Sequence, residues 1–176
     1  MNRWHHSPKH RTKAIGAYML TGSTINKEHL FHSTESLDML QLILMGLIER
    51  YHLGIRAWAL FPNHYHLILF TYSDSLPLNS FITHFHSLSA RNLNTLTNNP
   101  GRKVWFQYWD TQLTYKNSYL ARLNYVMQNP VRHNIVAYAE DYRWCSAKWF
   151  KEHAEPGHYN TVTSFKMDTL SIQDDF

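Results

Sequence analysis

The sequence predicts an α+β fold, built on a ferredoxin-like antiparallel sheet with helices added at its C-terminal end. Short segments rich in β-branched and aromatic residues alternate with longer segments of helical periodicity. Their order is strand, helix, strand, strand, helix, strand, followed by further helices. The first six elements are those of the split βαβ plan, in which two helices cover one face of a single sheet. The other face is then open to a third helix or to a ligand.

The first half of the chain contains the first four expected elements. We expect a strand over 14–22, closed by its final glycine, and a helix that begins at Thr34 and ends before Gly54. Strands are expected over 55–61 and 64–70, and the Pro-Asn dipeptide between them is a tight-turn signal, so they should form a hairpin. The helix assignment depends on apolar residues at helical spacing, namely Leu37, Leu40, Ile43, Leu44, Leu47 and Ile48.

The second half contains the remaining elements. We expect a helix over 77–96, an extended segment within 103–114 and a helix that starts near Ser118. Pro130 is expected to stop this helix or to lie just past its end, because the residue before a proline avoids helical geometry. The aromatic-rich segment from Tyr142 to His153 is expected to form a short helix.

These elements fit one domain over residues 14–153, with a basic arm over 1–13 and a loose tail over 154–176. A chain of 176 residues is long enough to bury a core. The arm has two readings, a phosphate-contacting segment or a merely solvated terminus. It has no acidic residue, and its cations are Arg3, Lys9, Arg11 and Lys13.

The composition favours a polyanionic partner only mildly, because the formal net charge is +4 and the pI is about 9.2. The single cysteine, Cys145, excludes an intramolecular disulfide and is expected to be a small core residue. No apolar run approaches the length of a membrane span, and no signal-peptide core follows the basic N-terminus. We therefore expect a cytoplasmic protein with no membrane partner.

The first chemical candidate is the His64-Tyr65-His66 segment. Because side chains alternate along a strand, the two histidines point to the same face. Two neutral imidazoles from one rigid strand form a chelating half-site for a metal ion. By itself the tripeptide is better explained by two ordinary, partly buried histidines, since the chain has 13 histidines.

The second candidate is Tyr125 with Asn129, which lie four apart on an expected helix and therefore share a face. The tyrosine offers a phenol, and the asparagine offers an amide oxygen that a hard metal ion accepts. Arg122 precedes the tyrosine by three residues and is placed to meet a phosphate. The competing interpretation makes Tyr125 a core residue, Asn129 a helix-end residue and Arg122 a solvated cation.

Both candidates lie in segments that resemble the REP-associated tyrosine transposases, of the HUH single-tyrosine transposase superfamily. The matching segments are FPNHYHLILF at 61–70, YWDT at 108–111 and LNYVMQNPVRHNIVAYAEDYRWCSA at 123–147. The resemblance covers roughly residues 14–150. It implies an enzyme that cuts and rejoins single-stranded DNA at hairpin-forming repetitive extragenic palindromes.

The resemblance also implies a role for each candidate residue. His64 and His66 match the metal-binding pair, Tyr125 matches the nucleophile, and Asn129 matches the third metal ligand, where some relatives carry Gln. A mixed nitrogen and oxygen site suits Mn²⁺ or Mg²⁺. Attack by Tyr125 on phosphorus leaves a 5′-phosphotyrosine and a free 3′-OH, so rejoining needs no ATP. Tyr119 lies about 240° away around the helix and should not replace Tyr125.

Several residues are candidates for DNA contact, although each by itself is better explained as a plain surface or packing residue. Trp105, Tyr108 and Trp109 are aromatic rings that either stack on bases or pack on the sheet. Asp110, in YWDT, either has a structural role or orients a site group. The candidate phosphate contacts besides the arm are Arg56, Arg91, Arg102, Lys103, Lys116, Arg122 and Arg132.

Two rival functions remain open at this stage: a non-catalytic nucleic-acid binder on the same sheet, and a metal-dependent phosphodiester hydrolase without a covalent step. The sequence does not define the DNA repeat, the cut position or the biological outcome. A homodimer and a monomer are both open, and a dimer could place Tyr125 opposite a partner's histidines.

Overall fold

A computed structural model describes residues 15–73 and 78–167, and its strands and helices follow the expected order. The four strands form one antiparallel sheet in the order β2-β3-β1-β4, which is the ferredoxin-like arrangement, so the predicted fold class is confirmed. The elements are β1 (Gly16–Thr24), α1 (Thr34–Arg50), β2 (Gly54–Leu60), β3 (His64–Thr71), α2 (Leu78–Leu96), β4 (Trp105–Gln112), α3 (Lys116–Arg132), α4 (Ala147–His153) and α5 (Pro156–Thr163), with 3-10 turns η1 (Ile25–Lys27) and η2 (Ala139–Asp141).

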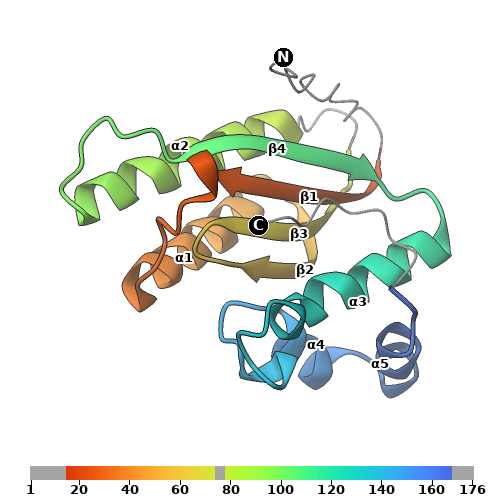
Figure 1. Cartoon of the computed structure of the whole chain (residues 1–176). Helices are drawn as coiled ribbons and strands as arrows, with labels where there is room; N and C mark the ends of the chain where they lie inside the picture. The colour runs from red at the N-terminus through yellow and green to blue at the C-terminus, as the bar shows by residue number, and fades with distance from the viewer. Residues whose placement is uncertain (1–14, 74–77, 168–176) are drawn as a thin grey trace, which may run out of the picture.

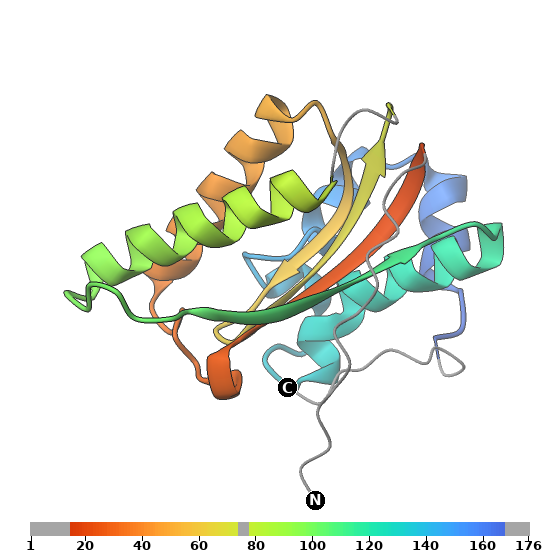
Figure 2. The ribbon, with the colours of Figure 1, turned by 90° about the horizontal axis from the view of Figure 1, so that it is seen from above.

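The sheet separates two cores (Figures 1 and 2). Helices α1 and α2 cover one face, and α3, α4 and α5 lie on the other. Strand alternation sorts the side chains between them: Tyr18 and Leu20 of β1 enter the α1–α2 core, whereas Met19 enters the α3 core. The predicted β-hairpin of β2 and β3 is present, and no helix among the described residues is long and apolar enough to cross a membrane.

Strand β1 extends past Gly22, where the sequence predicted that it would end. Gly22 pairs with Tyr65 across the sheet, and the Tyr65 ring lies over it. A Cβ added at Gly22 would lie 2.5 Å from that ring. The glycine therefore makes space for an aromatic side chain within the strand, and does not mark a turn.

Pro130 lies inside α3, so the expectation that it stops the helix is wrong. A proline cannot donate to the carbonyl four residues earlier. In this protein the Val126 carbonyl, which would accept that bond, lies 3.9 Å from the Cys145 sulfur, and the Met127 carbonyl lies 3.4 Å from it. The helix continues to Arg132, and Pro130 within it is buried.

The segment 142–146 is not helical, and the expected helix over 142–153 forms only from Ala147 onward. Instead the segment pairs with the outer edge of β2. The Leu60 N–H donates to the Trp144 carbonyl (3.0 Å), and the Ser146 N–H donates to the Trp58 carbonyl (2.8 Å). Because an edge strand has unpaired backbone groups, this distant segment completes the hydrogen bonding of β2.

The chain beyond residue 153 was expected to be loose, but helix α5 forms there and packs on α3. Val162 is fully buried in the α3 core. The Asn124 amide on α3 donates to the carbonyls of Thr163 (3.2 Å) and Phe165 (2.9 Å). These contacts tie at least residues 156–165 to the domain.

Candidate active site

His64 and His66 lie side by side on β3, on the face covered by α3. Their ring centroids are 5.2 Å apart. The exposed fraction of His64 is 2%, and that of His66 is 0%. The intervening Tyr65 points into the α1–α2 core, as strand alternation requires.

The hydrogen bonds at Nδ1 orient both imidazoles. Nδ1 of His64 lies 2.7 Å from the Asn63 amide oxygen. The Asn63 amide nitrogen donates to the Lys27 carbonyl (3.3 Å), which fixes the orientation of this amide. His64 therefore donates through Nδ1, and Nε2 carries its lone pair. Nδ1 of His66 is similarly engaged by the Thr21 hydroxyl at 2.8 Å. Such contacts at one ring nitrogen orient metal-binding histidines through the other.

Helix α3 places Tyr125 directly against this pair. The Tyr125 ring centroid lies 5.5 Å from that of His66, with the planes at 76°. The exposed fraction of Tyr125 is 2%. Neighbouring apolar residues of α3 pack into the same core and set the face that the helix presents, namely Leu120, Leu123, Val126 and Met127.

Asn129 lies on the same face of α3, one turn beyond Tyr125, and is fully buried. One further turn along, His133 caps the helix, and its ring centroid lies 5.1 Å from that of His64. Tyr125 thus contacts one histidine of β3 and His133 contacts the other. Asn129 lies between them along the helix, on the same helix face.

His133 is a site residue that the sequence analysis did not single out. The available signal was its spacing, since residues 125, 129 and 133 recur every four positions and share a helix face. Phe61 links the rings here: its centroid is 4.4 Å from His64 in a stacked arrangement and 5.4 Å from His133 in an edge arrangement.

Three of the candidate phosphate contacts lie near the face covered by α3. The Arg132 guanidinium lies over the Tyr125 ring, with its carbon 5.3 Å from the centroid. Arg56 lies over the Phe70 ring (5.6 Å) and is exposed. Arg122 donates to the Ser118 hydroxyl (2.5 Å), and burial lowers the pKa of its guanidinium from the ordinary value.

Two other candidate cations contact residues that are close to them in sequence. Arg102 donates to the Asn94 amide oxygen (3.1 Å) and the Thr97 hydroxyl (3.0 Å), so it fastens the end of α2. Lys103, just before β4, lies over the ring of Phe106 in that strand (5.8 Å). Of the remaining candidates, Arg91 on α2 and Lys116 at the start of α3 are exposed, and Arg3, Lys9, Arg11 and Lys13 lie outside the described residues.

The aromatic residues of β4 are divided between the two faces of the sheet. Trp105 is buried in the α1–α2 core, which confirms its packing interpretation. Tyr108 packs on the same side, and Asp110 pairs with Leu20, so its side chain is directed to that face and away from the histidines. Trp109 pairs with Thr21, which itself pairs with His66, so the half-buried Trp109 shares the face of the histidines.

The donor set fits a divalent cation of the mixed nitrogen and oxygen class. No group of three His, Cys, Asp or Glu side chains suited to a metal ion occurs among residues 15–73 and 78–167. A cation at this place would therefore use two imidazoles and the neutral amide of Asn129, and would keep sites for phosphate oxygens and water. An amide supplies weaker binding than a carboxylate, which suits a cation that also binds the substrate.

Comparisons with known proteins define the class of fold. No protein-family model and no curated protein matches the sequence. A solved structure of a REP-associated tyrosine transposase bound to a REP hairpin is similar to this chain, with a TM-score of 0.74 and 17% sequence identity over 94% of this chain and 95% of that one. A candidate transposase from Deinococcus radiodurans R1 is also similar, with a TM-score of 0.50 and 16% identity over 77% of this chain and 95% of that one. The resemblance inferred from the sequence motifs is thus confirmed as a likeness of fold to a REP-associated tyrosine transposase.

Proposed function

We propose that this protein is a metal-dependent single-stranded DNA endonuclease and strand transferase that acts in the cytoplasm on hairpin-forming repetitive palindromes. The observation that carries the proposal is the contact between the Tyr125 ring and His66, beside His64. A phenol next to two oriented imidazoles combines a nucleophile with a metal half-site. The likeness of fold to a transposase that binds a REP hairpin supports the DNA substrate.

The proposed reaction exchanges one phosphodiester for another. Tyr125 loses its proton to water or to a nearby base, and its oxygen attacks phosphorus. The P–O3′ bond breaks, the 3′-oxygen takes up a proton, and the 5′-phosphate remains on the tyrosine. A bound Mg²⁺ or Mn²⁺, held by His64, His66 and Asn129, would withdraw charge from the phosphate. Attack by a 3′-OH reverses the reaction and transfers the strand.

The remaining residues orient these groups. Thr21 and Asn63 fix the imidazoles, and Arg132 holds a positive charge over the Tyr125 ring, where it favours a developing phenolate. Because Tyr125 and His66 are buried, we expect the scissile phosphate to reach them through a local separation of α3 from the sheet. A single strand is thin enough to enter such an opening, whereas a duplex is not.

The test is covalent capture. The protein is incubated with Mn²⁺ and a labelled pool of single-stranded hairpin oligonucleotides with randomised loops and flanks, and then run on a denaturing gel. We expect a protein–DNA band that disappears in Tyr125→Phe and with a chelator, and persists in Tyr119→Phe. Cleavage that survives Tyr125→Phe would indicate simple hydrolysis. Hairpin binding without metal-dependent cleavage would indicate a binder.

A further inference from the structure

A pocket opens beside His64, outside the contact between Tyr125 and His66. It has a volume of about 450 Å³, within the range of small-molecule sites. The loop before α1, the β2–β3 turn, the end of α3 and the segment 142–146 together form its walls. His64 and Asn63 form part of the lining, so the pocket adjoins the proposed catalytic residues.

The lining is rich in rings and contains no formally charged residue other than histidine. Four imidazoles belong to it, and three further rings come from Phe61, Tyr142 and Trp144. No Asp, Glu, Lys or Arg is among the described residues that line it. Such a surface suits a flat, uncharged ligand with polar edges better than a phosphate. A nucleobase has these properties.

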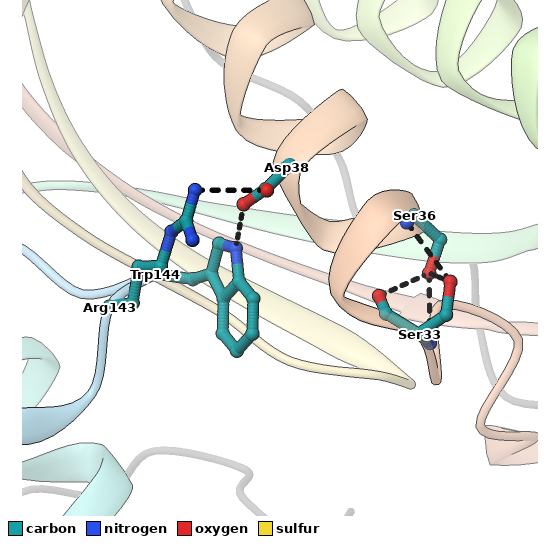
Figure 3. A network of polar contacts seen from close by, with 5 residues as sticks. All are labelled: Ser33, Ser36, Asp38, Arg143 and Trp144. Carbon is teal, nitrogen blue, oxygen red and sulfur yellow. Dashed lines mark hydrogen bonds and ion pairs between the residues drawn. The ribbon is translucent and has the colours of Figure 1, made fainter.

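Trp144 is held in place before any ligand arrives. Its indole N–H donates to Asp38 on α1 (2.8 Å), and the second oxygen of Asp38 accepts from Arg143 (2.9 Å), as Figure 3 shows. The Trp144 carbonyl accepts from the Leu60 N–H of β2 (3.0 Å). The ring is only partly buried. A ring fixed at both its backbone and its nitrogen loses little conformational freedom when it stacks on a ligand.

We propose that this pocket receives one unstacked nucleobase of the single-stranded DNA, the base that flanks the scissile phosphate, with Trp144 as its stacking surface. The proposal rests on the proposed function. Because His64 belongs both to the pocket and to the proposed metal site, a base in the pocket places its own phosphate beside that site. The pocket then sets the position of cleavage along the strand.

The free energy of stacking one base on an aromatic ring sets the size of the expected loss of DNA affinity. Removal of one aromatic ring from a base-stacking site weakens binding roughly 5- to 100-fold. This loss should depend on one nucleotide only. A strand that lacks that base has no ring to stack, so the same substitution should change its affinity by less than about twofold.

The experiment is a double-substitution cycle between protein and DNA. A strand is first selected from a random single-stranded pool by binding to the Tyr125→Phe variant, and is then synthesised with an abasic site at each position in turn. The affinity of each strand is measured for the Tyr125→Phe protein and for a protein that carries both Tyr125→Phe and Trp144→Ala. Trp144→Phe retains part of the ring and tests the same position with less risk to folding. Trp149→Ala, an exposed tryptophan on α4, is the matched control.

We expect coupling at a single nucleotide for Trp144→Ala, a smaller coupling at the same nucleotide for Trp144→Phe, and none for Trp149→Ala. Uniform loss at every position, or no loss in either Trp144 variant, would overturn the pocket proposal and leave the proposed function intact. Failure to select any strand would instead contradict the proposed function itself.

Discussion

At the scale of single residues, the two histidines of β3 have similar surroundings. Nδ1 of His64 lies beside the Asn63 amide oxygen, and Nδ1 of His66 lies beside the Thr21 hydroxyl. The His64 ring also contacts the ring of His133, and the His66 ring contacts that of Tyr125. A histidine oriented through Nδ1 binds a metal ion through Nε2 of the neutral imidazole.

His66→Gln should therefore weaken metal binding directly. Gln fills most of the same volume but supplies no imidazole nitrogen at the ring position. We expect the Mn²⁺ affinity, measured by electron paramagnetic resonance of the free ion, to fall more than about tenfold. His86→Gln, on the other face of the sheet, is the control and should leave Mn²⁺ affinity unchanged. Equal Mn²⁺ affinity in His66→Gln and the parent protein would show that β3 holds no metal.

His86 gives a prediction about pH. Its Nε2 lies 2.8 Å from the Tyr65 hydroxyl, and desolvation lowers the pKa of His86 to about 3. Between the unfolded-state pKa near 6.5 and this value, the unfolded chain binds a proton that the native state does not. Stability should therefore fall as the pH falls through this window, by at most about 1.4 kcal/mol per pH unit. Urea unfolding from pH 7 to 5 should show a shallower slope in His86→Gln, and identical slopes would be incompatible with a neutral buried imidazole.

At the scale of elements, periodicity predicted the sheet and its helices because each depends on local alternation or helical spacing. The end of β1 was missed because the role of Gly22 depends on Tyr65, 43 positions away along the chain, which pairs with it across the sheet. The path of 142–146 was missed for the same kind of reason, since its hydrogen-bond partners are on β2. Pro130 lies inside α3, and the Val126 carbonyl that it cannot bond is instead near the thiol of the distant Cys145, a contact that local rules do not include.

Gly22→Ala tests this long-range packing. The new methyl group would meet the Tyr65 ring at 2.5 Å, and such overpacking costs about 1–3 kcal/mol of unfolding free energy. Combining it with Tyr65→Leu, which removes the ring, should recover part of that loss relative to Tyr65→Leu alone. Denaturant titrations of the four proteins measure the coupling. Strict additivity of the two substitutions would contradict the proposed clash.

In the candidate site too, some features follow from local sequence spacing, and others depend on how distant elements pack together. The shared face of His64 and His66, and that of Tyr125 and Asn129, follow from strand and helix periods. That the two faces meet, and that His133 joins them, depends on how α3 crosses the sheet. The motif resemblance supplied that link from sequence, because composition and spacing contain no information about it.

At the scale of the whole molecule, Tyr125 contacts the histidine of its own chain. This arrangement predicts cleavage within one subunit, whether or not the protein forms dimers. A mixture of His66→Gln and Tyr125→Phe proteins should remain as inactive as either alone on hairpin DNA. Restored cleavage in the mixture, after subunit exchange, would show that the tyrosine helix works across a dimer.

The most direct measurement of the central claim is the identity of the DNA-linked residue. Trypsin cuts after Lys116, Arg122 and Arg132, so Tyr119 and Tyr125 fall in different peptides, and 123–132 contains no other tyrosine. After reaction with Mn²⁺ and nuclease trimming, mass spectrometry should find a 5′-phosphonucleotide on the 123–132 peptide at Tyr125. Its attachment to Tyr119, or cut DNA with no modified peptide, would contradict the account.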